Sequence, residues 1–153
     1  MASEQKQQEP ERVRLVKIRM LQDDAKIPTR ATWGSAGYDL YALADHNLPP
    51  KTQVKIETGV AMEIPEHMVG IIHSRSGLAF KHQVTAVTGV IDSDYRGDLS
   101  ILLVNHGQQP IQVKAGDRVA QLLLLKVHCP TLEVVDKLSD TSRQTRGFGS
   151  TGK

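Results

Sequence analysis

Short aliphatic runs separated by turn-forming residues dominate the chain from Val13 onward. Gly, Pro, Asn or Asp interrupts these runs roughly every 8–12 residues, a spacing typical of all-β sandwiches and barrels. In one run, Val60, Met62 and Ile64 alternate with polar or small residues, which is the period of a half-buried strand. Residues 54–56 and 111–113 repeat this pattern. The sequence therefore predicts an all-β fold, and the best helical candidate is the short piece 76–81.

Two runs are apolar on both faces of the expected strand. These are 101–104 and 119–127, the second interrupted by Gln121 and Lys126. Such a strand must be covered once by its own core and once by something else. In a chain of 153 residues, a second copy of the chain is the natural cover, so we expect a homo-oligomer.

Composition restricts the classes of partner and site. The 19 basic and 17 acidic residues give a net charge of only +2, which argues against nucleic acid or an anionic membrane as a dedicated partner. The six histidines are scattered, without the spacing of a zinc site. The single Cys129 excludes an internal disulfide and fits a reducing compartment. Residues 1–11 are too polar for a secretion signal, and we expect a disordered tail there. These features predict an intracellular, non-secreted protein of the cytoplasm or nucleus.

The segment from Ser74 to Ala79 combines side chains suited to an anion. Arg75 supplies a fork of donors for phosphate oxygens, Ser76 adds a hydroxyl, and Gly77 allows close approach of the backbone. If a helix starts here, its free N–H groups point at the same anion. The alternative is an ordinary polar turn before a helix.

The runs 84–91 and 99–104 flank a loop of Asp, Ser and Gly, which predicts a β-hairpin. Folding the hairpin about that loop places Gly89 opposite Ser100. A glycine leaves the pleat open, so that a flat base can lie on the backbone and be read by its N–H and C=O groups. Uracil and cytosine present opposite donor patterns. The wrong base would leave buried groups unpaired, at roughly 1–3 kcal/mol each.

Two side chains near the mouth of this hairpin could contact a bound nucleotide. Asp92 follows Ile91, from where a carboxylate could hold a water molecule. Tyr95 could lie against a sugar and exclude a 2′-hydroxyl. The alternative is a structural hairpin with turn-favouring aspartates.

Two polar side chains interrupt apolar strands elsewhere. Gln121 needs hydrogen-bond partners, from neighbouring backbone or from a phosphate-bearing ligand. Asp39 must be paired or help to hold a hydrated cation, and we favour a structural pairing.

The C-terminal stretch Arg146–Lys153 is rich in glycine and carries Phe148 in its middle. Gly147–Lys153 matches the spacing of a phosphate-binding P-loop, but that loop requires a Ser or Thr and a helix after the lysine. We expect instead a flexible arm that closes over a phosphorylated aromatic ligand. The alternative is a solvated terminus.

Taken in order, these five segments resemble the five motifs of the trimeric dUTPases, from about residue 26 to the C-terminus. The resemblance implies a jelly-roll-like β-barrel subunit of the β-clip type, spanning residues 12–138. It implies a homotrimer with active sites shared between subunits and an exchanged arm at 139–153. It further implies hydrolysis of dUTP to dUMP and pyrophosphate, which keeps uracil out of DNA and supplies dUMP for thymidylate synthesis.

The resemblance also assigns roles. Asp92 is the expected general base for in-line attack of water on the α-phosphorus, and Phe148 is expected to stack on uracil. Mg²⁺ is expected on the phosphates without a direct protein ligand, with Asp39 at most acting through water. The expected substrate-binding residues are Arg75, Ser76, Gly77, Gly89, Val90, Ile91, Tyr95, Ser100, Gln121, Arg143, Phe148 and Gly149.

The chain departs from the family pattern at three positions. Ser74 stands where a proline is usual, which predicts a looser turn before Arg75. Gln144 and Arg146 replace glycines of the arm, which predicts a stiffer hinge. Register assigns Arg143 to the γ-phosphate, and Arg146 remains an alternative for that contact.

Two other functions are compatible with such a scaffold. A dCTP deaminase would need a glutamate beside the base, and the chain has no Glu between Gly89 and Val104. A non-catalytic nucleotide-binding regulator would not need a water-activating carboxylate such as Asp92.

Overall fold

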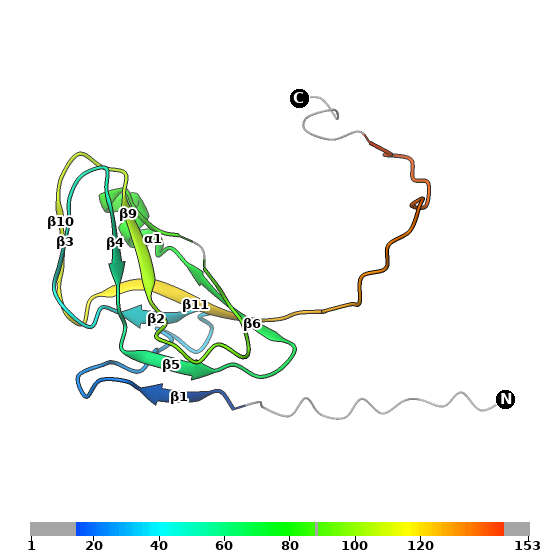
Figure 1. Ribbon diagram of the computed structural model, residues 1–153. Helices are drawn as coiled ribbons and strands as arrows, with labels where there is room; N and C mark the ends of the chain where they lie inside the picture. The colour runs from blue at the N-terminus through cyan, green and yellow to red at the C-terminus, as the bar shows by residue number, and fades with distance from the viewer. Residues whose placement is uncertain (1–14, 88, 146–153) are drawn as a thin grey trace.

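Strands are the main regular elements of the computed structural model, which describes residues 15–87 and 89–145 (Figure 1). The predicted mostly-β fold with one short helix is confirmed. Within the described residues the elements are β1 (Lys17–Met20), β2 (Tyr38–Tyr41), β3 (His46–Leu48), β4 (Gln53–Ile56), β5 (Val60–Glu63), β6 (Met68–His73), α1 (Ser76–His82), β7 (Val84–Ala86), β8 (Gly89–Ile91), β9 (Ile101–Asn105), β10 (Ile111–Val113) and β11 (Arg118–Lys126).

The strands form antiparallel ladders only, as far as the described residues go. The largest sheet has the order β2-β11-β6-β8, and a second sheet has the order β4-β9-β7. Two small ladders, β1-β5 and β10-β3, complete the body. The long strand β11 pairs with β2 on one side and β6 on the other, so it ties three distant segments of the chain together.

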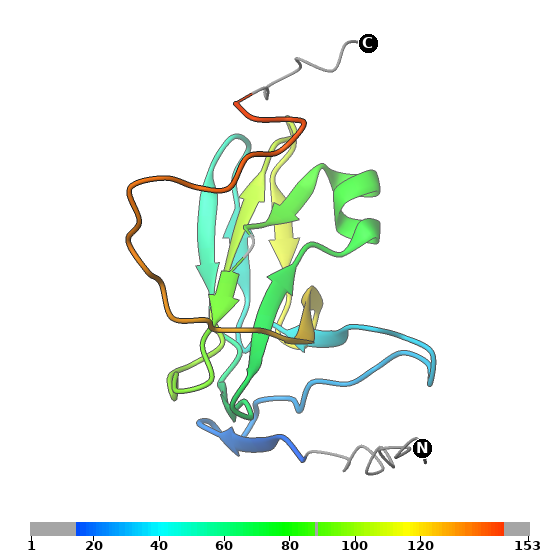
Figure 2. The same cartoon turned by 90° about the vertical axis from the view of Figure 1, so that its right-hand side faces the viewer.

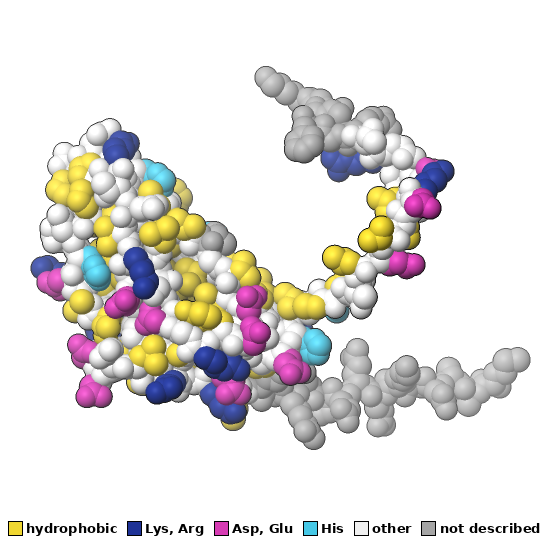
Figure 3. Space-filling model, in the orientation of Figure 1, with side chains coloured by type: hydrophobic (Ala, Val, Ile, Leu, Met, Phe, Trp, Pro, Cys, Tyr) yellow, Lys and Arg dark blue, Asp and Glu magenta, His cyan; other side chains and the backbone are white. Residues whose placement is uncertain are grey.

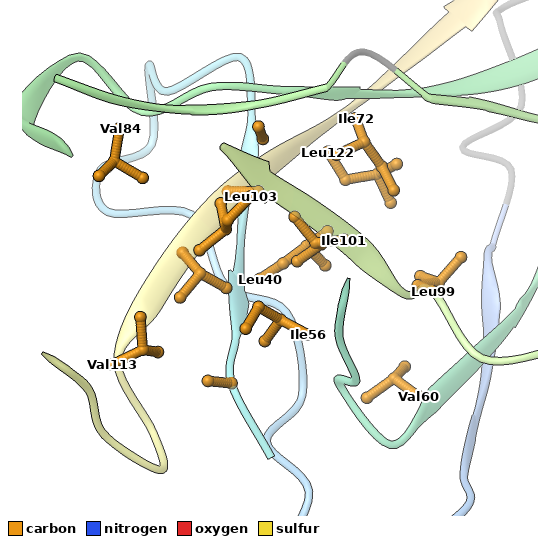
Figure 4. Packing of buried hydrophobic residues seen from close by; sticks show 14 of the residues in the cluster. Leu40, Ile56, Val60, Ile72, Val84, Leu99, Ile101, Leu103, Val113 and Leu122 are labelled. Atoms are coloured by element: carbon orange, nitrogen blue, oxygen red, sulfur yellow. The ribbon is translucent and has the colours of Figure 1, made fainter. Parts of the chain in front are cut away.

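Aliphatic side chains fill the space between the two larger sheets (Figure 4). Leu40 and Leu122 come from the four-stranded sheet, and Ile56, Ile101 and Leu103 from the three-stranded one. All five are at most 2% exposed. Alternation along each strand sends these residues inward, and burying one such side chain stabilises the fold by about 1.5–3 kcal/mol.

The outward faces of the two doubly apolar strands are less well covered. In β9, Leu102 and Val104 are half-buried while their neighbours are fully buried. In β11, Leu123 is half-buried and Leu125 is 48% exposed. This uneven burial leaves apolar surface on the outside of the subunit.

The predicted hairpin forms in its first part. Val84 pairs with Asn105 and Ala86 with Leu103, a register that would place Gly89 opposite Ser100 if it continued. The strand instead divides, because Gly89–Ile91 forms β8 and pairs with β6.

Helix α1 begins after Arg75, whose backbone is extended, and ends at Gln83 in the left-handed conformation. The Gln83 N–H closes the last turn on the carbonyls of Leu78 and Ala79. The prediction of a short helix here is confirmed, with an end one residue beyond the predicted Lys81.

Residues 128–145 leave the body after β11 as an extended and exposed segment (Figures 1 and 2). Hydrophobic side chains stand open along it (Figure 3), among them Leu132, Val134 and Leu138 with exposed fractions of at least 80%. The predicted tail 1–11 lies outside the described residues. No helix in the described part of the chain is long and apolar enough to cross a membrane.

Asp45 holds the turn between β10 and β11. Its carboxylate accepts the Ala115 N–H and the Lys114 ammonium, each at 2.9 Å. The backbone hydrogen bond, followed by the one from Lys114, lowers the pKa of Asp45 below its ordinary value of 3.8.

We therefore predict an acid-dependent contribution from this turn. A folded-state pKa that is lowered stabilises the fold above the unfolded pKa, and the contribution disappears as the pH falls through the folded value. Asp45→Asn should lower the urea midpoint slightly at pH 6, and the difference from wild type should shrink at a pH below the ordinary Asp pKa of 3.8. An equal difference at both pH values would contradict this account.

Candidate functional site

A shared carboxylate joins three of the predicted motifs. Asp39 on β2 is 9% exposed. Its Oδ1 lies 3.0 Å from Nε of Arg75, and its Oδ2 lies 3.4 Å from Nη1 of Arg118. Arg75 also donates through Nη1 to the Arg118 carbonyl at 3.0 Å. The prediction that Asp39 is structurally paired is confirmed, and the pairing fixes the arginine that precedes α1.

The turn before Arg75 is tied down by Ser74. Its hydroxyl accepts the Ala86 N–H at 2.9 Å and donates to the Ala86 carbonyl at 3.1 Å. Its own carbonyl accepts Nε2 of Gln121 at 2.9 Å. The prediction of a looser turn at Ser74 is therefore wrong. The usual proline would restrain the turn by its ring, and the Ser74 hydroxyl restrains it by two hydrogen bonds to β7.

Gln121 thus finds a backbone partner within the chain, one of the two outcomes left open by the sequence. A Cβ at Gly37 would lie 2.6 Å from Oε1 of Gln121, so glycine is needed there to admit the amide. The loop 30–35, which precedes Gly37 in the chain, is closed by Arg30, which donates to the carbonyls of Trp33 and Ser35.

Asp39, Arg75 and Gln121 are among the residues that line one pocket of about 290 Å³. Its walls come from the loop after residue 30, from β2, from the start of α1 and from β11. They are Ala31, Ser35, Ala36, Gly37, Asp39, Arg75, Ser76, Gly77 and Gln121. The predicted phosphate cradle and Gln121 are therefore together, with a guanidinium, a hydroxyl and an amide facing a small polar space.

The hairpin residues form a second group. Asp92 directly follows β8 and is exposed, and its carbonyl accepts the Tyr95 N–H at 3.1 Å to close a turn. Tyr95 is 44% exposed. The Ser100 hydroxyl donates to Asp98 at 2.6 Å. On β8, Val90 is 64% exposed, while Gly89 and Ile91 are half-buried.

Within one chain the two groups lie at opposite ends of β6. Ile91 pairs with Gly70 and Gly89 with Ile72, so Asp92 follows on toward the start of β6 while Arg75 follows its end. With a rise of about 3.3 Å per residue, Asp92 and Arg75 are roughly 15–20 Å apart along the strand direction. Figure 2 shows α1 and the hairpin loop at opposite ends of the body. These two residues of one chain cannot meet on one phosphate group.

The remaining predicted residues lie on the C-terminal segment. Arg143 is exposed, beyond the residues that line the pocket. Phe148 and Gly149, like Arg146, lie outside the described residues. In residues 15–87 and 89–145, no group of three or more His, Cys, Asp or Glu side chains could hold a metal ion.

Sequence reasoning missed three contributors. Arg118 pairs with Asp39, and its carbonyl accepts a hydrogen bond from Arg75. Residues of the loop 30–35 line the pocket. Asp98 holds the hairpin through its hydrogen bonds. A polar residue beside a turn carries no signal of its partner, since each of these contacts joins segments distant in the sequence.

The fold is a β body with a pocket that carries a guanidinium, a hydroxyl and an amide, groups that suit an anion. The dUTPase family model matches residues 23–152, and the chain belongs to this family. It is 43% identical over 135 residues to a probable deoxyuridine 5′-triphosphate nucleotidohydrolase of Schizosaccharomyces pombe, covering 88% of this chain and 96% of that protein. It is also 43% identical to the human mitochondrial deoxyuridine 5′-triphosphate nucleotidohydrolase, covering 87% of this chain but 53% of that protein.

Solved structures agree with this assignment. A dUTPase of Staphylococcus bacteriophage 80alpha, determined with dUpNHpp, superposes with a TM-score of 0.87 at 29% identity, covering 91% of this chain and 99% of that one. The dUTPase of phage phi11 of S. aureus, described with a structural Mg(II) ion, gives 0.77 at 29% identity, covering 81% and 98%.

We predict that Ser74→Ala destabilises the fold by about 1–3 kcal/mol, because two backbone groups of Ala86 lose their partner. The free energy of unfolding in urea measures this. Thr131→Ala, on the exposed C-terminal segment, should leave it unchanged and serves as the control. Equal values for both variants would show that the Ser74 hydroxyl does not hold the turn.

Proposed function

We propose that this chain hydrolyses dUTP to dUMP and pyrophosphate by in-line attack of water on the α-phosphorus. The observation that carries the proposal is the convergence of Arg75, Ser76, Gly77 and Gln121 on one pocket, in a member of the dUTPase family. The reaction of the family's named relatives requires a site that binds a triphosphate and expels pyrophosphate.

The pocket suits the phosphate chain of the substrate. Asp39 orients Arg75 through Nε, which leaves Nη2 of the guanidinium to face an anion. Ser76 is exposed at the start of α1, where its hydroxyl can donate near the leaving group. Positive charge placed in advance stabilises the charge that develops on the departing pyrophosphate. Arg143 is proposed to add a second positive charge at the γ-phosphate.

The hairpin suits the nucleoside and the attacking water. We assign Asp92 as the general base, with its exposed carboxylate at the end of β8. Tyr95 lies against the sugar, and Gly89, Val90, Ile91 and Ser100 read the base. Neither Gly77 nor Gly89 has a positive φ, and a Cβ at either would meet no close contact within the chain. Packing within the chain therefore does not require glycine at these two positions. Close approach of a ligand or of a neighbouring chain would require it.

The separation of cradle and hairpin favours active sites between subunits, and the family resemblance implies that the assembly is a homotrimer. One subunit would give the cradle and a second the hairpin, since Asp92 and Arg75 of the same chain are too far apart. The half-covered outer faces of β9 and β11 supply apolar surface for the contact. The subunit is proposed as a jelly-roll-like barrel of the β-clip type, with domain 12–138 and an exchanged arm at 139–153 that brings Phe148 and Gly149 over the base.

Magnesium fits this site only when it is bound to the phosphate groups of the substrate. Both oxygens of Asp39 are engaged by arginines, which leaves it at most a water-mediated contact with a cation. Bound to the phosphate groups, Mg²⁺ would supply charge neutralisation there. The residues of the chain then need only to bind and orient the phosphates.

The experiment that tests this function is the release of pyrophosphate from dUTP, UTP, dCTP and dTTP in the presence of Mg²⁺. We expect rapid hydrolysis of dUTP alone. Equal rates with all four nucleotides would contradict the assignment of base and sugar recognition to the hairpin.

Asp92→Asn should lower kcat by about 10²–10⁴-fold, the contribution of a general base, while dUpNHpp still binds. Stopped assays for pyrophosphate and titration calorimetry with dUpNHpp measure the two effects. Asp94→Asn is the matched control, because Asp94 is an exposed carboxylate of the same loop. Unaltered turnover in Asp92→Asn would remove Asp92 from this role.

Deletion of residues 143–153 should abolish hydrolysis and leave the trimer intact, because the strands that would form the subunit contact lie before that segment. Sedimentation equilibrium gives the mass of the assembly. Dissociation on truncation would show that the arm is chiefly architectural.

A further inference from the structure

Asp98 lies at the root of the hairpin loop and is engaged on every side. Its carboxylate accepts the Gly59 N–H at 2.6 Å, the Thr58 N–H at 3.3 Å and the Ser100 hydroxyl at 2.6 Å. Thr58 and Gly59 belong to the tight turn between β4 and β5 and are buried. An ionised carboxylate is an acceptor only, so it matches a site that presents three donors.

The backbone of Asp98 extends this network into the loop. Its carbonyl accepts the Tyr95 hydroxyl at 3.0 Å and the Ser100 N–H at 2.8 Å. The next residue, Leu99, donates its N–H to the Val60 carbonyl at 2.8 Å. The root of the hairpin is thus fixed to the β4–β5 turn, and the Tyr95 ring is fixed to the root.

The path of the Tyr95 ring across the loop depends on Gly97. A Cβ at Gly97 would collide with the hydroxyl and ring of Tyr95. Gly97 has no positive φ, so glycine is required here for space and not for backbone conformation. Two neighbouring residues therefore set where the Tyr95 ring lies. Gly97 leaves space for the ring, and the carbonyl of Asp98 accepts its hydroxyl.

We propose that Asp98 is a positioning residue for sugar selection: it anchors the hairpin root to the β4–β5 turn and thereby holds the Tyr95 ring where it excludes a 2′-hydroxyl. This inference rests on the proposed function, in which Tyr95 lies against the deoxyribose. Asp98 touches neither the sugar nor the phosphates in this account. Its effect on substrate choice passes through Tyr95 and Ser100.

The test compares kcat/KM for dUTP and for UTP in the full-length chain and in Asp98→Ala, Asp98→Asn, Gly97→Ala and Tyr95→Phe. Asp98→Ala and Gly97→Ala should each reduce the preference for dUTP over UTP by at least about tenfold. Asp98→Asn should fall between wild type and Asp98→Ala, because an amide oxygen still accepts one of the two buried N–H groups. Asp94→Ala, in the same loop, should keep the wild-type preference.

A double variant distinguishes positioning from general stability. If Asp98 acts through the tyrosine, Asp98→Ala combined with Tyr95→Phe should lower the preference no further than the larger single change. A role in stability alone would lower the unfolding midpoint and reduce both kcat/KM values equally, with the dUTP preference intact, and this result would overturn the proposal. If Asp98→Ala fails to fold, Gly97→Ala and Asp98→Asn decide the question, and unchanged preference in both refutes it.

The outcome for the wild-type chain separates this inference from the function on which it rests. A wild-type chain without activity on dUTP would refute the proposed function and the inference together. Selective hydrolysis by wild type, with the same selectivity in Asp98→Ala, Asp98→Asn and Gly97→Ala, would overturn the inference alone.

Discussion

The arrangement of the candidate site depends on one buried carboxylate. Asp39 lies on β2 and is paired with Arg75 before α1 and with Arg118 at the start of β11. A nearly buried carboxylate is costly unless it is paired and hydrogen-bonded, so these three segments must come together for the fold to be stable. The same requirement places a guanidinium on the wall of the pocket. The ion pairs that stabilise the fold therefore also give the arginine the position that the proposed anion binding requires.

Chain topology then determines what a single subunit can and cannot offer. The antiparallel pairing of β8 with β6 carries Asp92 away from the cradle that follows β6. Phosphate groups and attacking water must nevertheless meet within a few ångströms in any hydrolysis. In the proposed assembly they would meet, because the cradle of one copy would face the hairpin of another. The incompletely covered apolar faces of β9 and β11 would give the surface for such contacts.

Much of the fold could be predicted from the sequence, because period-2 alternation in residues such as Val60, Met62 and Ile64 reports burial directly. The short helix and the pairing of Asp39 were predictable for similar local reasons. The partner of β8 was not, since Gly89–Ile91 carries no signal that distinguishes β6 from β9. The hydrogen bonds of the Ser74 hydroxyl were not predictable, because both partner groups belong to Ala86, which follows α1 in the chain. The Asp98 network was missed for the same reason, as its donors Thr58 and Gly59 are some forty residues away.

In the proposed assembly, each active site combines Arg75 of one copy with Asp92 of another. Co-refolding of the Arg75→Ala variant with the Asp92→Asn variant tests this arrangement. Neither variant alone should hydrolyse dUTP. The first variant should still fold, because Asp39 keeps its ion pair with Arg118. Random mixing into trimers should restore about a quarter of the wild-type sites, each with both residues intact. We expect recovery of about that fraction of dUTP hydrolysis. Mixed trimers that form and stay inactive would contradict it.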